Sequence, residues 1–207
     1  MTIYAKIHIE NPQSRLVKQA VEIIHGGGVV VYPTDSLCAI GCHMGDKAAM
    51  DRIRQLKNAD KQHNFTLICR DLSDIATYAK VDNWAYRLLK SLTPGPYTFI
   101  LKATREVPKR LQHPKRKTIG LRVPAHPVSQ LLLETLGEPL MSCTLTLPDS
   151  ELFLTDEDDL RDLLSNRVDM IMDGGYCGHE PSTVIDLTEG YPQVIRAGKG
   201  DVSSLDY

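Results

Sequence analysis

The apolar run Val29–Tyr32 constrains the fold of this chain more than any other segment. Its consecutive β-branched residues are typical of a strand that is buried on both faces of a sheet. Before this run, apolar residues recur at helical spacing from Leu16 to Ile24, and the glycines Gly26–Gly28 end that pattern. We expect this amphipathic helix to begin at the capping pair Asn11-Pro12. Because a strand with two apolar faces needs cover on both sides, the segment predicts a sheet with helices on its faces.

Strand-like and helix-like patterns alternate along the rest of the chain. Predicted helices span 47–56, 71–79, 83–91, 127–136 and 157–164, and predicted strands span 65–69, 97–103, 118–123, 140–147, 168–172, 183–187 and 193–196. The last two strands follow each other closely, which indicates that part of the sheet is antiparallel. The 207 residues contain no repeat period and no long low-complexity linker, so the sequence predicts one α/β domain with a mixed, twisted sheet.

Composition argues against a membrane protein. Hydrophobic residues make up 42% of the chain and charged residues 24%, and no run approaches the roughly 20 apolar residues of a membrane helix. The segment Met1–Lys6 lacks the basic start and apolar core of a secretory signal. We therefore expect a soluble, cytoplasmic protein with no membrane partner.

The five cysteines predict reduced thiols, because their number is odd and the chain is large enough to fold without cross-links. They are Cys38, Cys42, Cys69, Cys143 and Cys177. Cys38 and Cys42 lie four residues apart, but no second Cys or His pair at finger-like spacing accompanies them. We expect no zinc site, and the sequence assigns no other metal ligand.

The polar turn Thr34–Ser36 is a candidate ligand site, because it follows the carboxyl end of the buried strand, where open α/β sheets bind ligands. The glycines Gly26–Gly28 precede a strand instead of opening a helix, so they match neither a Walker A loop nor a dinucleotide-binding fingerprint. Turn capping alone would also explain these polar residues. The sequence leaves both interpretations open.

Three arginines could bind phosphate or carboxylate groups: Arg54 at a helix end, Arg122 within a strand and Arg196 before a glycine. Burial of the Arg122 guanidinium without a partner would be costly, and either a ligand or an internal carboxylate could be that partner. Thr144 and Thr146 alternate along one strand, so both hydroxyls can face a ligand or a neighbouring strand. No catalytic triad can be assembled from spacing, and we assign no catalytic residue.

The segment from Lys102 to Lys117 is strongly basic, with seven Lys or Arg residues against one Glu. Its candidate RNA-binding residues are Lys109, Arg110, Lys115, Arg116 and Lys117. Such a density of positive charge is typical of a surface that binds nucleic acid or another anion. A solvated face that keeps the protein soluble is the equally weighted alternative.

Four groups of motifs resemble the YrdC-like family. In chain order they are Val31-Tyr32-Pro33-Thr34-Asp35-Ser36, Pro94-Gly95-Pro96-Tyr97-Thr98, Gly120-Leu121-Arg122-Val123-Pro124-Ala125-His126-Pro127, and Pro181–Asp186 with Val194–Gly198. Within the family, His63–Leu67 and Asp173–Tyr176 are most similar to the YciO branch. The resemblance covers about residues 12–198 and implies a single domain over residues 1–207. It also implies an open, twisted, mixed sheet with helices on its faces and a large, positively charged concavity.

The resemblance implies a function as well. The best-known members are nucleotidyltransferases that make threonylcarbamoyl-adenylate from L-threonine, bicarbonate and ATP, with Mg²⁺ expected, and release pyrophosphate. This reaction begins the synthesis of threonylcarbamoyladenosine at tRNA position 37. Some members bind double-stranded RNA, so the alternative is a protein that binds double-stranded RNA or tRNA in the same concavity without making an adenylate.

By this similarity, two sets of residues would form the site. The substrate would lie near Thr34, His63, Arg122 and Ser182, and the nucleotide near Arg54, Thr144, Thr146 and Arg196. Two departures from the family pattern predict weak or altered activity. A Lys-x-Arg pair is replaced by Arg54-Gln55-Leu56, and a Ser-x-Asn motif by Thr144-Leu145-Thr146. Lys57 or Lys61 could supply the missing cation.

Overall fold

Ten strands form one sheet in the computed structural model, which describes residues 1–58, 65–146, 157–175, 177–203 and 205. They are β1 (Ile3–Lys6), β2 (Val30–Tyr32), β3 (Ala39–His43), β4 (Thr66–Ile68), β5 (Tyr97–Lys102), β6 (Thr118–Arg122), β7 (Leu140–Thr144), β8 (Met170–Asp173), β9 (Thr183–Asp186) and β10 (Gln193–Arg196). Their order across the sheet is β1-β8-β2-β3-β7-β4-β6-β5-β9-β10. The pairs β1–β8, β2–β8, β4–β6 and β5–β9 are parallel and the others antiparallel, which confirms the mixed sheet.

Helices occupy the predicted positions within about two residues. They are α1 (Ser14–His25), α2 (Lys47–Leu56), α3 (Leu72–Tyr78), α4 (Asn83–Leu92), α5 (Pro127–Leu136) and α6 (Glu157–Leu164). The expected start of α1 at Asn11-Pro12 is wrong, because Gln13 is the N-cap and the Asn11 amide instead donates to His8 Nδ1 at 3.1 Å. In the ranges given above, no helix is long and apolar enough to cross a membrane.

Strand β2 is buried on both faces, as its apolar run predicts. On one face, Val31 packs in the same apolar cluster as Ile53 of α2. On the other, Tyr32 packs in a second cluster with Ile24 of α1. Helices therefore cover the two faces of this strand. The strand ends at Tyr32, and the polar turn Thr34–Ser36 follows it closely.

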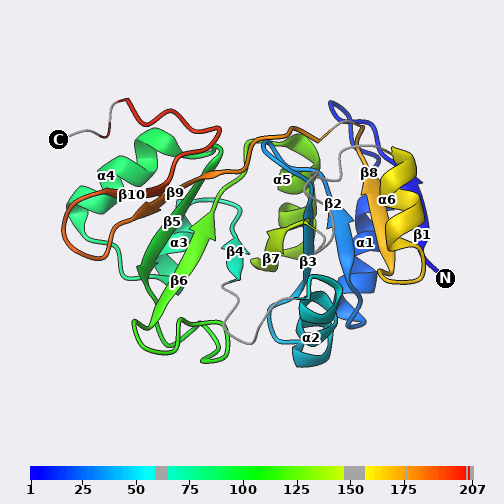
Figure 1. Cartoon of the computed structure of the whole chain (residues 1–207), viewed down its shortest axis with the longest axis horizontal. Helices are drawn as coiled ribbons and strands as arrows, with labels where there is room; N and C mark the ends of the chain where they lie inside the picture. The colour runs from blue at the N-terminus through cyan, green and yellow to red at the C-terminus, as the bar shows by residue number, and fades with distance from the viewer. Residues whose placement is uncertain (59–64, 147–156, 176, 204, 206–207) are drawn as a thin grey trace.

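The sheet extends the length of the molecule, with the two termini at opposite ends (Figure 1). Strands β5, β6, β9 and β10 lie at one end with α3 and α4, and β1, β2 and β8 lie at the other with α1 and α6 (Figure 1). Strands β7 and β4 join the two halves through an antiparallel pair, in which Thr66 lies opposite Ser142. The middle of the sheet therefore brings together residues from both halves of the chain.

Two cysteines form a disulfide, so the expectation that all five are reduced is wrong. Cys38, in the loop before β3, is bonded to Cys177, in the connection from β8 to β9, with 5.4 Å between their Cα atoms. The other three, Cys42, Cys69 and Cys143, are free and buried. A partner 139 residues away in the chain could not be predicted from spacing. The bond ties the loop that follows the polar turn to the segment that leads into Ser182.

Candidate functional site: a cationic cavity across the middle of the sheet

A cavity of about 660 Å³ lies over the middle strands and is lined by residues from β3 to β7 and from β9 and β10. Its polar lining consists of Thr34, Lys57, Thr66, Thr98, His113, Arg116, Thr118, Arg122, Ser142, Thr144, Thr146, Ser182 and Arg196. Apolar side chains such as Phe65, Ile100 and Ile195 complete the wall. Four of these residues are Lys or Arg, and none of the described lining residues is Asp or Glu. The site therefore favours an anionic ligand.

The strand register explains how the cavity floor forms. Residues two apart along a strand point to the same face, so Gly120 and Arg122 of β6 both face the cavity. Gly120 pairs with Thr66 of β4, and a Cβ at Gly120 would lie only 3.0 Å from the Thr66 hydroxyl oxygen. A side chain at this position would therefore crowd the floor beside Arg122.

Arg122 is the most deeply buried cation of the site, with 8% of its side chain exposed. Its Nη1 donates to Ser36 Oγ at 2.9 Å, and its Nη2 donates to the Asp35 carboxylate. Asp35 also accepts from the Ala125 amide at 3.0 Å. The Nε of Arg122 is buried and has no acceptor among the described residues. The internal ion pair is therefore present, and one donor of the same guanidinium is left without an acceptor among the described residues.

The polar turn is stabilised by its own side chains, and one of its residues also lines the cavity. The Thr34 hydroxyl donates to the Leu37 carbonyl at 2.6 Å, which stabilises the turn. Thr34 also lines the cavity beside Arg122. Turn capping and a place at the site are thus compatible in one residue.

Ser182 and Arg196 bring the end of the chain to the site. The Ser182 and Thr98 hydroxyl oxygens are 2.9 Å apart, and Arg196 Nη2 donates to the Ser182 carbonyl at 2.8 Å. Within the part of the chain that the structure describes, Arg196 has no ion pair. Burial lowers the pKa of Arg196, and the nearby cation Arg122 lowers it further. Two like charges that repel each other in the lining of one cavity favour the binding of an anion there.

Lys57 follows the last residue of α2 and reaches the end of β7. Its Nζ donates to the Thr144 carbonyl and to the Thr146 hydroxyl, both at 2.6 Å. Burial lowers the pKa of the Lys57 ammonium. All three residues line the cavity, so Thr144 and Thr146, which the resemblance assigns to the nucleotide, share a wall of the cavity with a cation.

The basic segment forms the loop from β5 to β6. One side of this loop faces the cavity, and the other side faces outward. Leu111, His113 and Arg116 line the cavity, and of these three only Arg116 was a predicted binding residue, as a candidate for RNA. Arg116 Nη2 donates to Asp186 at 2.6 Å. Burial alone would raise the pKa of Asp186, but hydrogen bonds from Thr188 and from Arg116 outweigh it and keep the pKa below its usual range. Arg116 is therefore part of the cavity wall.

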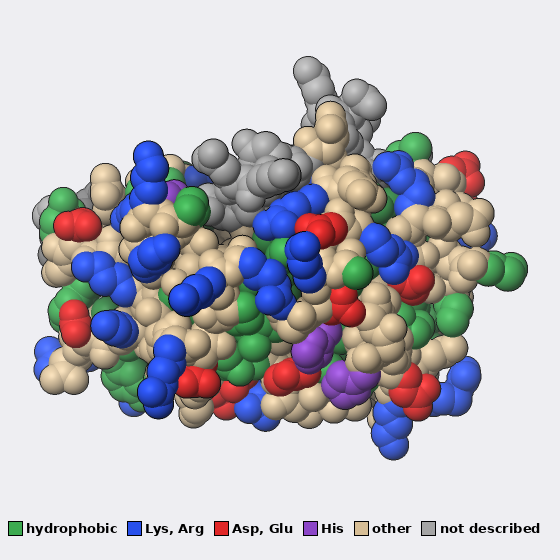
Figure 2. Space-filling view, turned by 90° about the horizontal axis from the view of Figure 1, so that it is seen from below, with side chains coloured by type: hydrophobic (Ala, Val, Ile, Leu, Met, Phe, Trp, Pro, Cys, Tyr) green, Lys and Arg blue, Asp and Glu red, His purple; other side chains and the backbone are tan. Residues whose placement is uncertain are grey.

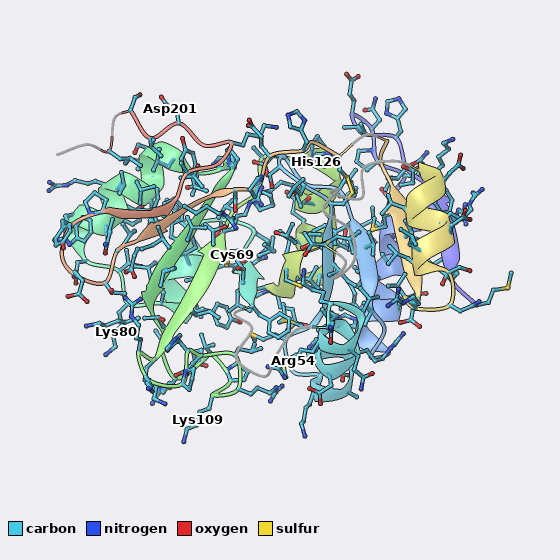
Figure 3. The ribbon with its side chains drawn as sticks, in the orientation of Figure 1. Arg54, Cys69, Lys80, Lys109, His126 and Asp201 are labelled. Carbon is cyan, nitrogen blue, oxygen red and sulfur yellow. A yellow bond between two sulfur atoms is a disulfide. The ribbon has the colours of Figure 1, made fainter. Side chains whose placement is uncertain are left out.

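The outer side of the loop is exposed and positively charged. Lys109, Lys115 and Lys117 are exposed there, and Arg110 is exposed while its guanidinium donates to the Met44 carbonyl at 3.1 Å. Figure 2, which views the molecule from below, shows Lys and Arg side chains spread over the left half and centre of this face. Lys109 lies at the outer tip of the loop (Figure 3).

Among the described residues, Arg54 is a predicted nucleotide-binding residue that does not line the cavity. Arg54 Nη1 donates to Asp51 at 3.1 Å, and its guanidinium lies 5.1 Å from the centre of the Phe65 ring, which does line the cavity (Figure 3). His63 lies outside the described residues. Leu56, at the position where the family pattern has its second cation, is buried in the apolar core.

The chain is similar to proteins of known families. A family model named Sua5/YciO/YrdC and described as "Telomere recombination" matches residues 22–198. YciO of Escherichia coli strain K12 is 56% identical over 202 residues, 98% of each chain, and a crystal structure of E. coli YciO matches all of both chains with a TM-score of 0.95. A threonylcarbamoyl-AMP synthase of Nitrosococcus oceani is 39% identical over 61% of this chain and 68% of its own. The P. abyssi Sua5 crystallised with L-threonine is 26% identical, with a TM-score of 0.87, over 95% of this chain and 58% of its own.

Proposed function

The chain belongs to the Sua5/YciO/YrdC family, and we propose that it is a nucleotidyltransferase that forms an adenylate in the cavity. The proposed substrates are L-threonine, bicarbonate and MgATP, and the products are threonylcarbamoyl-AMP, which serves tRNA modification, and pyrophosphate. Similarity to a threonylcarbamoyl-AMP synthase and to a Sua5 that binds L-threonine supports this choice.

One observation carries the proposal: the cavity holds more positive charge than its own residues neutralise. Lys57 and Arg196 have only uncharged partners among the described residues, and Arg122 keeps a buried Nε without an acceptor. Leaving a buried donor or charge without a partner costs free energy, which a bound anion would recover. The volume of about 660 Å³ lies within the range of ligand pockets, roughly 300–1,000 Å³.

The chemistry we propose needs positioning and charge rather than a catalytic nucleophile. The amine of threonine attacks carbon dioxide with loss of a proton, or bicarbonate with loss of water, to give a carbamate. An oxygen of this carbamate attacks the α-phosphorus of ATP while pyrophosphate leaves. Arg122, Thr34 and Ser182 would hold the amino acid, and Arg196 would lie beside the phosphates. Because no carboxylate lines the described cavity, Mg²⁺ would arrive as part of MgATP, bound by phosphate oxygens and water.

The departures from the family pattern predict reduced activity. One lost charge-assisted contact is worth about 1.5–3 kcal/mol, or roughly tenfold to hundredfold in binding. Placing an arginine at Leu56 would not restore that contact, because the side chain at this position points into the apolar core. A replacement for the missing cation must therefore come from another residue.

The proposal is tested by pyrophosphate release. We expect purified protein with L-threonine, bicarbonate and MgATP to release pyrophosphate above the level seen without threonine. Serine, which lacks the threonine methyl group, serves as the matched control for the amino acid. Equal pyrophosphate release with and without threonine would contradict an adenylate-forming activity.

A second candidate function, RNA binding, is favoured by the exposed lysines Lys109, Lys115 and Lys117 on the outer side of the β5–β6 loop. We expect the affinity for double-stranded RNA or tRNA to fall steeply as salt increases. Replacing Lys115 and Lys117 by glutamine should weaken binding and reduce the slope of log K against log salt by about one unit for each lost phosphate contact. Filter-binding titrations at several salt concentrations measure both effects.

The matched control for that measurement is the double change Lys18→Gln and Lys90→Gln, which removes the same charge from the exposed surfaces of α1 and α4. Equal losses in both double variants would mean that only net charge matters. Binding that does not depend on salt would also count against the RNA surface.

A further inference from the structure

Compared with the family pattern, the cation at the end of α2 stands one residue later in this sequence, at Lys57. The family pattern has its second cation at the position of Leu56, which here is 6% exposed and packs in the apolar core. The next residue, Lys57, is the C-cap of the helix, and its amide donates to the Ile53 carbonyl at 3.1 Å. The turn at this cap carries the Lys57 side chain to β7 and the cavity.

The contacts of Lys57 hold its ammonium at the cavity without neutralising it. Two oxygens accept at 2.6 Å, the Thr144 carbonyl and the Thr146 hydroxyl, and the Thr146 carbonyl lies farther away at 3.5 Å. No carboxylate lies within ion-pair distance among the described residues. A partly buried ammonium with only uncharged acceptors is suited to an anion that joins them.

From this geometry we infer that Lys57 is a phosphate-binding residue, which supplies the cation missing at Leu56, and that Thr146 is its positioning residue. The inference rests on the proposed function, because it assigns a phosphate group of the nucleotide to the ammonium. It also connects the two departures from the family pattern. Lys57, which follows the departing residue Leu56, donates a hydrogen bond to Thr146, which belongs to the second departure.

A purely structural role predicts different results. If Lys57 only tied the end of α2 to β7, its replacement would lower stability and leave ligand affinity unchanged in the folded protein. If Lys57 binds phosphate, its replacement weakens the binding of inorganic pyrophosphate and ATP but not of threonine. Affinity for each ligand therefore separates the two roles.

Isothermal titration with inorganic pyrophosphate, with ATP and with threonine is the test. We expect Lys57→Met to weaken pyrophosphate and ATP binding about tenfold to hundredfold, and Lys57→Arg to lose much less. Thr146→Val should weaken both about threefold to tenfold, because the ammonium loses an acceptor that positions it. Lys47→Met, at the exposed first residue of α2, is the matched control and should bind as the wild type does.

A second measurement does not require a variant. Acetic anhydride modifies free lysine amines, so saturating pyrophosphate should slow acetylation of Lys57 in the wild type but not that of Lys47, as followed by mass spectrometry. Unchanged affinity in Lys57→Met, or unprotected Lys57, would overturn the inference and leave the proposed function standing. A wild-type protein that binds neither pyrophosphate nor ATP would overturn both.

Discussion

Replacing Arg122 by methionine should lower the free energy of unfolding by about 3–5 kcal/mol and abolish pyrophosphate release. The guanidinium is buried with Asp35, whose side chain is 11% exposed, and removing it leaves that carboxylate buried without its cation. The same change removes the Arg122 guanidinium, and its positive charge, from the cavity wall. Urea unfolding of wild type and variant measures the first effect, and the threonine-dependent assay measures the second.

Two companion variants separate stability from function at this residue. Adding Asp35→Asn to Arg122→Met removes the unpaired carboxylate, so it should recover part of the stability but none of the activity. Arg122→Lys keeps the charge beside Asp35 but loses the planar fork and its Nε. We expect this variant to fold and to lose about tenfold to hundredfold in activity. Full activity in folded Arg122→Lys would contradict a role for the fork in binding.

Reduction of the Cys38–Cys177 disulfide should lower the free energy of unfolding by about 2–5 kcal/mol. The bond closes a long loop, because its two cysteines are 139 positions apart in the sequence, and a cross-link over such a distance strongly restricts the unfolded chain. Urea unfolding with and without a thiol reductant measures the change.

Cys177→Ser is the matched control for that comparison, because reductant should no longer affect its stability. A thiol titration of the denatured, unreduced protein gives the complementary result. It should count three thiols, those of Cys42, Cys69 and Cys143. Five thiols, or equal stability of the wild type with and without reductant, would contradict the cross-link.

Local patterns predicted most of the fold. The helices have apolar residues that recur at helical spacing, and most strands have runs of apolar or β-branched residues. They did not reveal β3, whose residues Ala39–His43 include a glycine and a cysteine and carry little strand propensity. They also did not reveal β1, a strand of only four residues at the chain end. Both strands are fixed by pairing, β3 with β2 and β7 and β1 with β8, and pairing partners are not encoded in local periodicity.

The candidate site was predicted less completely. Thr34, Arg122, Ser182 and Arg196 meet at one cavity, and each lies at or near the end of a strand, β2, β6, β9 and β10 respectively. Residues on the β5–β6 loop were harder to predict, since the path of a loop depends on tertiary contacts such as the ion pair of Arg116 with Asp186. The position of Lys57 was hard to predict for the same reason, because it depends on the backbone conformation at the C-cap of α2.

The most direct test of an adenylate-forming site is detection of its product. Wild-type protein should convert MgATP, L-threonine and isotopically labelled bicarbonate into threonylcarbamoyl-AMP that carries the label, with an equal amount of pyrophosphate, and Arg122→Lys should form far less. Liquid chromatography with mass spectrometry follows the labelled adenylate. If folded wild-type protein forms no labelled adenylate and releases no pyrophosphate above the threonine-free control, the proposed activity is wrong.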